Sequence, residues 1–511
     1  MRRRRLLAIL VAIVAVTAAS ALAVAASRRT HGTAEQIARS YFQAWGRSDV
    51  PGMSALVHEA PSDFFEQHRT FSTSLGVDEI ELKPGAVRAT GEESAEVPFS
   101  GRRKLRALGW WEFESTLRLA VREGAWRVLW TPETLHPLLK DGGILEIDKV
   151  ESPSVVLVTA EGEKFPADSY ARHYLDRLAA GYPNAVGQAL QVILPDDSVR
   201  RLISTVDKPK RQRTTLSRPI QAAAARALDG VPEAAIVAIR SSTGEVLAVA
   251  DRLSGGERAF STFYPPGSTF KVVVAAALLR SGLTPSDPVG CPAAYTVPFS
   301  VTIPNADDAD RGTLPFLEAF AHSCNTSFVE QAVTRLGPEE LTEVSAEWGF
   351  RPMTLPTGVG GGCGQLGDLT DPDNFGEAVI GGVSTVTATP LCMAAVAAAV
   401  ESGVWRSPRL LPAKEAERLD GPAPSEVELG EDVAGALREM MSATVSMGTA
   451  AGMGLPEGTA GKTGTAEVAQ QRSHAWLIGY RDDVAFAVFV RNGGSGRAAA
   501  VPIAARFLQG L

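Results

Sequence analysis

The sequence has no excess of basic residues and few histidines. Its 511 residues include 50 Lys and Arg against 58 Asp and Glu, a formal net charge of −8. This balance argues against a nucleic-acid partner. None of the seven histidines stands beside a zinc-like set of ligand residues, so we expect no metal site. The hydrophobic content of 45% is ample for buried cores, and the length predicts more than one domain.

An uncharged run follows four arginines at the start of the chain. Arg2–Arg5 precede Leu6–Ala26, a run of 21 residues. A membrane span needs about 20 apolar residues, whereas the core of a signal peptide usually has about 7–15. We therefore expect residues 1–27 to hold a single-pass anchor of the plasma membrane, with the remaining chain on the extracellular, cell-wall side. The alternative is a cleaved signal, because Ala21-Leu22-Ala23 has the form of a cleavage site.

Residues 28–140 are predicted to form a small α+β domain. Thr33 precedes a segment in which apolar residues recur at helical spacing, and a second short helix is expected over 49–57. After these helices, period-two alternation predicts strands. The strands are expected at 77–87, 95–100, 110–121 and 125–131. We interpret the domain as a spacer with its aromatic residues in the core; the alternative is a hydrophobic pocket that binds a ligand.

Residues 141–212 are predicted to be a short pedestal or a linker. The stretches LEIDKV and SVVLVTA are typical of strands, and DSYARHYLDRLAA is typical of a helix. The last predicted domain then covers residues 213–511. In it, AAIVAI and EVLAVA are expected to pair as a hairpin through SSTG.

The stretch YPPGSTFKVVVAAALL is the candidate nucleophile site. A Pro-Pro-Gly turn leads into Ser268, Lys271 follows three residues later, and an apolar run that can form a buried helix comes next. If the helix begins at Ser268, both side chains lie on one face, so the amine can take the hydroxyl proton. The structural alternative is a serine that caps the helix, with Lys271 at the surface.

Two later stretches decide between these interpretations. Ser323-Cys324-Asn325 follows 55 residues after the serine (268 to 323), and Lys462-Thr463-Gly464 follows 139 residues later (323 to 462). Ser-x-x-Lys, Ser-x-Asn and Lys-Thr-Gly, in this order, are the signature set of penicillin-binding proteins and serine β-lactamases. The chain therefore resembles the penicillin-binding transpeptidases over residues 213–511. Residues 126–138 resemble the end of the nuclear-transport-factor-2-like domain that precedes some of these enzymes.

The resemblance implies an α+β, multi-domain fold. It comprises an N-terminal membrane helix, a small cone-like α+β spacer domain, and a transpeptidase domain with an antiparallel sheet between helices. It also implies a class B-type, monofunctional enzyme, because residues before the active serine resemble a spacer and not a glycosyltransferase. Such an enzyme would depend on a glycan-polymerising partner, and it needs neither a metal nor an organic cofactor.

The same resemblance assigns the catalytic roles. Ser268 would attack the penultimate D-alanine carbonyl of a stem peptide, and Lys271 would act as its base. A neutral lysine needs a depressed pKa, which burial and the charge of Lys462 can supply. Ser323 would relay a proton to the leaving amine, and Asn325 would bridge Lys271 and the substrate amide.

The third motif would bind the substrate. Lys462 would attract the terminal carboxylate, Thr463 and Thr465 would donate hydrogen bonds to it, and Gly464 would leave room for the substrate beside the strand. The backbone N–H groups of Ser268 and Thr465 would form the oxyanion hole. The product is an acyl-enzyme that a second stem peptide resolves; penicillin and other β-lactams would be trapped there.

Two alternatives share these motifs. A β-lactamase is usually a compact soluble domain without a long anchored spacer, and a β-lactam-binding receptor needs an intracellular output.

Four cysteines, Cys291, Cys324, Cys363 and Cys392, permit disulfides in three connectivities. Buried free thiols are slightly favoured, since Cys324 lies inside the second motif and Cys392 in an Ala-rich helix. His474, before a predicted strand, is interpreted as structural.

Overall fold

The computed structural model describes residues 31–382, 385–418 and 425–511. The predicted membrane anchor at residues 6–26 lies outside these ranges. In the part that is described, no helix combines the length and the apolar composition that crossing a bilayer requires.

The chain folds into two compact units whose sequences interleave. The N-terminal unit runs to Ser154 and also contains Asn184–Pro209, and the C-terminal unit contains Val155–Pro183 and Lys210–Leu511. The domain boundaries predicted at residues 140 and 212 remain predictions. The interleaving means that the predicted connector region contributes strands to both units.

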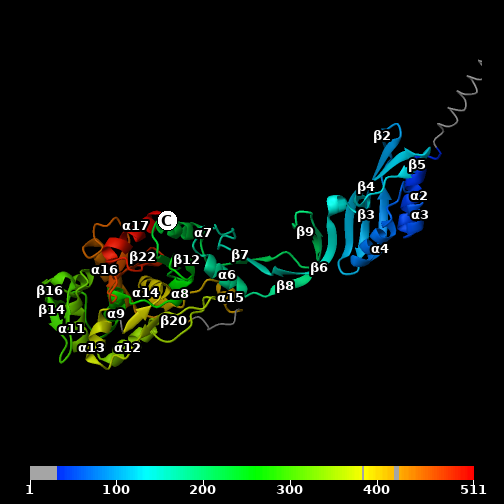
Figure 1. Ribbon diagram of the computed structural model, residues 1–511. Helices are drawn as coiled ribbons and strands as arrows, with labels where there is room; N and C mark the ends of the chain where they lie inside the picture. Colours follow the sequence, from blue (N-terminus) through cyan, green and yellow to red (C-terminus); the bar gives the residue numbers. More distant parts are fainter. Residues whose placement is uncertain (1–30, 383–384, 419–424) are drawn as a thin grey trace, which may run out of the picture. The chain divides into compact units, whose positions relative to one another are not determined.

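The N-terminal unit is an α+β domain, as predicted. Its main antiparallel sheet has the order β1-β3-β4-β5, with β2 beside β3. Helices α2, α3 and α4 cover one face of this sheet (Figure 1). A second sheet has the order β6-β8-β9. The strands are β1 Val77–Pro84, β2 Arg88–Gly91, β3 Ser94–Leu105, β4 Gly109–Arg122, β5 Ala125–Val128, β6 Ile144–Pro153, β8 Asn184–Ile193 and β9 Val199–Ser204; the helices are α2 Ala34–Gly46, α3 Val50–Ser54, α4 Phe64–Ser74, α5 Pro132–Leu135 and η1 Pro137–Gly142.

Local sequence explains two of these helix starts. The Thr33 hydroxyl accepts a hydrogen bond from the Gln36 backbone N–H, and the Gln36 side chain reciprocates, which forms a capping box before α2. Asp49 caps α3. Helix α4 was not predicted, because Thr and Ser residues interrupt its apolar pattern; Phe64 and Phe71 are nevertheless buried seven residues apart on one face.

A five-stranded antiparallel sheet forms the centre of the C-terminal unit. Its order is β12-β11-β23-β22-β21. The predicted hairpin is confirmed, since β11 pairs with β12. The strands are β11 Ala234–Arg240, β12 Val246–Asp251, β21 Ala460–Ala466, β22 His474–Arg481 and β23 Val484–Val490.

Both faces of this sheet are buried, because alternate residues of each strand enter different cores. Ile236 and Val488 pack with helices α7 (Arg218–Ala227) and α17 (Val501–Gln509). Val237 and Phe489 belong to the core on the other face, where α14 (Pro390–Ser402) contacts β23 and β11. A sheet with helices on both faces agrees with the expected architecture.

The segment inserted between β6 and β8 belongs to the C-terminal unit. Strand β7 (Val155–Val158) pairs in parallel with β10 (Lys210–Arg213). Helix α6 (Arg172–Ala180) buries Tyr174, whose hydroxyl donates to Asp251 Oδ2 at 2.5 Å. The strand and helix predicted in this region are confirmed.

Short elements surround the remainder of the C-terminal unit. Among them, α9, α10, α11 and α16 lie beside the site described below. The elements are α8 Arg258–Ser261, η2 Gly267–Phe270, α9 Lys271–Arg280, β13 Pro288–Cys291, β14 Ala294–Thr296, β15 Thr302–Pro304, η3 Ala306–Asp308, β16 Gly312–Pro315, α10 Phe316–Ala321, α11 Asn325–Arg335, α12 Pro338–Glu347, β17 Gly364–Leu366, α13 Pro372–Val379, β18 Val386–Ala388, β19 Val404–Arg406, α15 Ala413–Ala416, β20 Glu426–Glu428, α16 Glu431–Ser446 and η4 Gly496–Ala500.

The preference for free thiols was wrong. Cys291 bonds to Cys324, and Cys363 bonds to Cys392. Their Cα atoms lie 6.2 Å and 4.4 Å apart, within or at the edge of the usual range. Each pair is brought together by tertiary packing: β13 packs against α11, and the segment before β17 packs against α14. The position of Cys324 in the second motif and of Cys392 in a helix therefore does not prevent disulfide formation.

Candidate active site

The turn before Ser268 packs directly against strand β21. Gly267 has φ +53°, and its N–H donates to Gly381 O at 3.2 Å. A Cβ at Gly267 would lie 2.5 Å from Thr465 O. Only glycine tolerates both this backbone conformation and this approach. The turn therefore fixes the position of Ser268 relative to the strand that carries Lys462.

Ser268 lies on a short 3-10 turn that continues as an α-helix. The turn η2 spans Gly267–Phe270, and α9 starts at Lys271. A 3-10 helix has three residues per turn, so Ser268 and Lys271 stand one above the other. This agrees with the predicted common face. Ser268 is half-buried, and Lys271 is fully buried.

Lys271 donates hydrogen bonds to two oxygens of the second motif. Its Nζ lies 2.8 Å from Ser323 O and 2.6 Å from Asn325 Oδ1, and it is 3.4 Å from Ser323 Oγ. The first two atoms can only accept. A neutral amine that donates its two protons to them keeps its lone pair for another partner. In the described chain no hydrogen bond joins Lys271 to Ser268, and such contacts often tighten only when substrate binds.

Ser323 bridges two lysines. It lies in the turn between α10 and α11 with φ +62°. Its hydroxyl is 2.9 Å from Lys462 Nζ and 3.4 Å from Lys271 Nζ. Lys462 donates a further bond to Thr463 O at 3.0 Å. The structure thus brings together Lys271, Ser323, Asn325 and Lys462, which lie on three distant segments.

Burial alone is enough to disfavour the charged form of both lysines. Lys271 and Lys462 are each fully buried, and within the described residues neither forms an ion pair with a carboxylate. Burial lowers the pKa of Lys462 to about 7. Burial, and then the charge of Lys462, holds the pKa of Lys271 well below its usual range. An amine that can be neutral at physiological pH can accept a proton from a serine hydroxyl.

The substrate-motif threonines differ in exposure. Thr463 is buried, and its hydroxyl lies 2.5 Å from the hydroxyl of Thr449. Thr465 is exposed, and its hydroxyl accepts from the Gly496 N–H at 3.2 Å. Arg497 donates to Thr449 O at 2.7 Å and so holds the segment beside Thr463.

Gly464 has a packing role that the motif did not predict. A Cβ there would lie 2.8 Å from both Pro266 O and Thr269 Cγ2. Glycine at this position lets the Ser268 turn approach β21. The predicted room for substrate, and the predicted oxyanion hole from the N–H groups of Ser268 and Thr465, remain predictions, although these two segments are neighbours.

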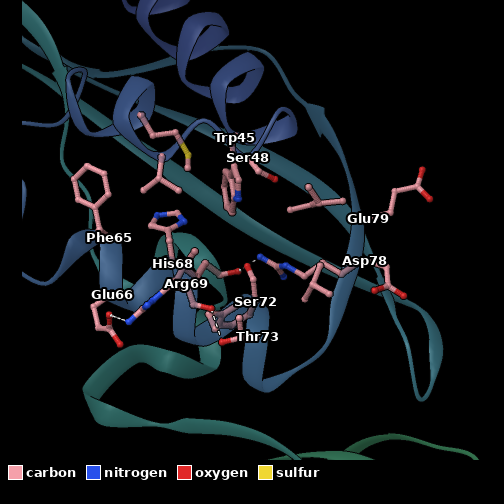
Figure 2. A pocket seen from close by; sticks show the side chains of 17 residues that line it. Trp45, Ser48, Phe65, Glu66, His68, Arg69, Ser72, Thr73, Asp78 and Glu79 are labelled. Atoms are coloured by element: carbon pink, nitrogen blue, oxygen red, sulfur yellow. Dashed lines mark hydrogen bonds and ion pairs between the residues drawn. The ribbon is translucent and has the colours of Figure 1, made fainter.

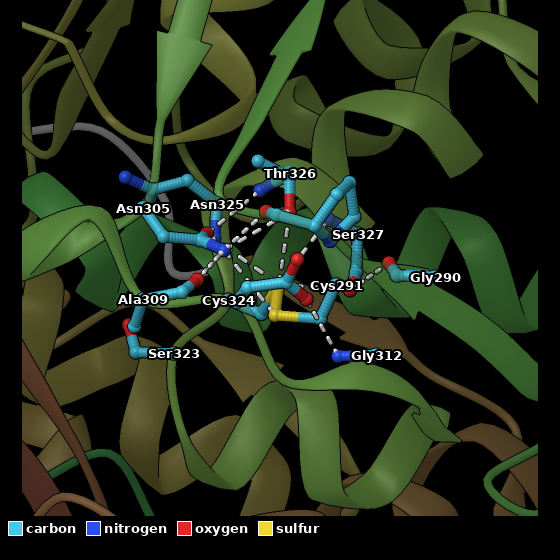
Figure 3. Close-up of a disulfide and its surroundings, with 12 residues drawn as sticks. Gly290, Cys291, Asn305, Ala309, Gly312, Ser323, Cys324, Asn325, Thr326 and Ser327 are labelled. Atoms are coloured by element: carbon cyan, nitrogen blue, oxygen red, sulfur yellow. Dashed lines mark hydrogen bonds between the residues drawn. A yellow bond between two sulfur atoms is a disulfide. The ribbon is translucent and has the colours of Figure 1, made fainter.

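Asn305 organises the turn of the second motif. Its Oδ1 accepts from the backbone N–H of Asn325 at 2.8 Å and from that of Thr326 at 3.1 Å. Its Nδ2 donates to Pro292 O and Ala309 O. Figure 3 shows the Asn305 side chain facing this turn beside the Cys291–Cys324 disulfide. No sequence motif marks Asn305 or Thr449, because single residues in loops carry no periodic pattern.

His474 lies in the packing layer behind the site. Its Nδ1 accepts from the Asn492 N–H at 3.1 Å, and its ring meets Tyr264 edge-on at 5.7 Å. The position agrees with the predicted structural role.

Comparison with known families assigns this arrangement. Residues 234–509 match the penicillin binding protein transpeptidase domain. The chain belongs to the penicillin-binding transpeptidase family. Residues 33–143 match the NTF2-like N-terminal transpeptidase domain, which confirms the predicted resemblance to the nuclear-transport-factor-2-like family.

Curated relatives support the same assignment. The chain is 31% identical over 356 residues to peptidoglycan D,D-transpeptidase PbpA of Mycolicibacterium smegmatis, covering 57% of this chain and 70% of that protein. It is 31% identical over 276 residues to PbpA of Mycobacterium tuberculosis, covering 48% of this chain and 54% of the relative. The chain thus spans little more than half of the M. tuberculosis protein.

Solved structures agree. A ceftriaxone acyl-enzyme complex of M. tuberculosis penicillin-binding protein A superposes with a TM-score of 0.52 at 26% identity, covering 60% of this chain and 80% of that one. The D,D-transpeptidase domain of an Eggerthella lenta peptidoglycan glycosyltransferase shares the fold, with a TM-score of 0.55 at 22% identity, covering 71% of this chain and 98% of that one.

Proposed function

We propose that Ser268 is the nucleophile with which this peptidoglycan D,D-transpeptidase cross-links stem peptides. The observation that carries the proposal is the Ser323 hydroxyl placed between two buried amines, one of which, Lys271, lies one turn beyond Ser268. Because no carboxylate pairs with either amine in the described residues, each can exist in neutral form. A pair of amines that share a hydroxyl can pass a proton in either direction.

Acylation forms one bond to the acyl carbon and breaks another, and it needs one proton removed from Ser268 and one delivered to the leaving amine. Lys271 Nζ takes the proton from Ser268 Oγ as Oγ bonds to the penultimate D-alanine carbonyl carbon. The oxyanion would be held by the N–H groups of Ser268 and Thr465. The C–N bond then breaks, and the terminal D-alanine leaves with a proton delivered through Ser323. The acyl-enzyme reacts with the amine of a second stem peptide, which restores the Ser268 hydroxyl.

The third motif would orient the donor peptide. The exposed Thr465 hydroxyl is available to the terminal carboxylate. Lys462 is fully buried, so we assign it an electrostatic role behind the threonines and a hydrogen bond that orients Ser323. A β-lactam carries the same carboxylate and an acyl carbon that Ser268 can attack, and relatives form acyl-enzymes with such drugs.

We also place the enzyme on the extracellular side of the plasma membrane, anchored by residues 6–26. The arginines before this uncharged run support this orientation. Two disulfides in the C-terminal unit support an oxidising compartment. The membrane helix and a glycan-polymerising partner remain part of this proposal.

Labelling with fluorescent penicillin tests the nucleophile. The wild type should give a long-lived adduct, and Ser268→Ala should give none. A parallel assay with a pentapeptide donor and an amine acceptor should show D-alanine release and a cross-linked product. An adduct that clears within seconds would indicate a β-lactamase, and a stable adduct without peptide turnover would indicate a receptor. An adduct that survives Ser268→Ala would exclude Ser268.

A further inference from the structure

The N-terminal unit contains a cavity of about 710 Å³. Its wall comes from helices α2, α3 and α4, from β1, from β3 and from α5. Apolar side chains such as Trp45, Phe71 and Ile80 line it together with His68 and Arg103. Figure 2 shows Trp45 and His68 pointing into the same space. The volume falls in the range of sites that bind small organic molecules.

Arg103 is buried in this wall with an unsatisfied donor. Its side chain is only 2% exposed. Nη2 donates to Leu135 O at 2.8 Å, but Nη1 has no hydrogen-bond partner among the described residues. The guanidinium lies 3.7 Å from the ring centre of Phe113 and 4.7 Å from that of Phe71. Rings stack on the guanidinium faces, so they leave its in-plane N–H groups without an acceptor.

Arg102, the preceding residue of β3, has a guanidinium with a carboxylate partner and serves as a comparison. Arg102 points to the opposite face of β3, is exposed, and donates two hydrogen bonds of 2.7 Å to the carboxylate of Glu81. It also lies 4.3 Å from the Trp110 ring centre. Arg103 has the aromatic contacts but lacks the carboxylate. Buried cations are normally paired, so the missing anion is the unusual feature.

His68 supplies a second unsatisfied group. It is 5% exposed, and its Nε2 has no hydrogen-bond partner in the described chain. Burial, and then the charge of Arg103, lowers the pKa of His68 to about 4. The ring is therefore neutral at physiological pH and can donate one hydrogen bond from Nε2.

Three acidic side chains, Glu66, Asp78 and Glu79, also line the cavity, and none of them pairs with Arg103. Glu79 is exposed. Glu66 pairs with Arg69, and Asp78 pairs with Arg106 at 2.8 Å. Both carboxylates are exposed, whereas Arg103 is buried. The buried part of the wall thus combines apolar side chains with one guanidinium that lacks an anion and one neutral donor, and the carboxylates lie at the exposed rim.

We propose that this cavity binds an organic monocarboxylate. The carboxylate would accept hydrogen bonds from Arg103 Nη1 and His68 Nε2, and its apolar body would pack against Trp45, Phe71 and Ile80. A single negative charge matches the single unpaired guanidinium, whereas a dianion would leave one charge buried without a partner. This inference is independent of acyl transfer at Ser268.

Calorimetric titration of the full chain tests the proposal with a matched pair of probes. 4-Phenylbutyrate carries the carboxylate, and 4-phenylbutyramide has the same shape without charge. We expect the wild type to bind the anion at least tenfold more tightly than the amide. Arg103→Met should abolish this preference, and the matched variant Arg102→Met should retain it.

Hydrogen–deuterium exchange locates the binding. Phenylbutyrate should protect peptides that cover α4 and β3. Thr73→Trp, a substitution of an exposed residue in the cavity wall, should weaken binding of both probes and keeps the test valid if Arg103→Met fails to fold. Equal affinity for anion and amide, no binding of either at millimolar concentration, or protection confined to the C-terminal unit would each overturn the proposal.

Discussion

Both units bury basic side chains without a carboxylate partner among the described residues, but they bury different cations. The C-terminal unit encloses Lys271 and Lys462, and the N-terminal unit encloses Arg103. Burial disfavours charge in each place. A lysine responds by releasing its proton, whereas a guanidinium keeps its proton at physiological pH.

Burial of an unpaired cation therefore has a different chemical consequence in each unit. The lysines are surrounded by neutral acceptors such as Ser323 and Asn325, which hold an amine and leave its lone pair available. Arg103 is surrounded by rings, and burial lowers its pKa only to about 9. Under the two proposals above, the first environment favours a neutral amine that can act as a base, and the second leaves a guanidinium that lacks an anion.

Replacing the buried lysine Lys271 by arginine should have the largest effect, which is on the rate of acylation. Lys271→Arg keeps the charge but removes the titratable amine, so acylation by penicillin should fall by about 10³-fold. Acylation by the Lys271→Met variant should be slowed by a similar factor. The measurement is the second-order rate constant of labelling, with the exposed Lys414→Arg as control. A Lys271→Arg rate within tenfold of the wild type would show that Lys271 is not the base.

Removing each disulfide in turn should show which bridge affects stability alone and which also affects acylation. The bridges close loops with sequence separations of 33 and 29 residues. Removing either as a double alanine variant should lower the free energy of unfolding of the C-terminal unit by about 4 kcal/mol. Only the Cys291–Cys324 variant should also slow acylation, by roughly tenfold, because Cys324 lies between Ser323 and Asn325.

Urea unfolding and labelling rates measure these two effects. The Cys363–Cys392 variant is the matched control. Equal acylation rates in both variants would mean that the first bridge does not position the second motif.

The buried lysines should make stability depend on pH. Because the folded pKa of Lys462 is about 7 and the unfolded pKa is near 10.4, the unfolded state binds more protons between these values. Stability should therefore rise with pH in that window, by about 2 kcal/mol from pH 7 to pH 9 for this residue. Lys462→Met should flatten the slope, and Lys414→Met should not. An unchanged slope in Lys462→Met would contradict the depressed pKa.

The smallest effect should come from the arginines. Arg102→Met removes an exposed ion pair and should change the free energy of unfolding by no more than about 1 kcal/mol. Arg103→Met should be equally mild, because an apolar chain replaces a buried cation whose pairing is incomplete. Chemical unfolding of the N-terminal unit measures both. A loss of several kcal/mol in Arg103→Met would show that its ring contacts serve stability.

Sequence reasoning was strongest where chemistry imposes a motif. Ser268, Lys271, Ser323, Asn325 and Lys462 were predicted as one site. The structure links the last four in one hydrogen-bonded chain, in which Lys271 bonds to Asn325 and Ser323, and Ser323 bonds to Lys462. Central strands were also predicted, because uninterrupted apolar runs identify them.

Features that depend on tertiary contacts could not be predicted from the sequence. Asn305 and Thr449 act through loop positions that no spacing marks. The disulfides depend on which helix packs against which strand, which the sequence left open. Helix α4 has only a partial apolar stripe, and its buried side chains become evident from the cavity they enclose.

The interleaved order of the two units constrains synthesis on the ribosome. Strand β6 cannot pair until β8 has been made, and the intervening residues 155–183 belong to the other unit. Tyr174 then waits for Asp251, which follows 77 residues later. At about 5–20 residues per second, this delay is about 4–15 s. Strand β7 of the inserted segment can pair with β10 once residue 213 has been made, but a nascent protein halted before residue 251 would leave the Tyr174 hydroxyl without its acceptor.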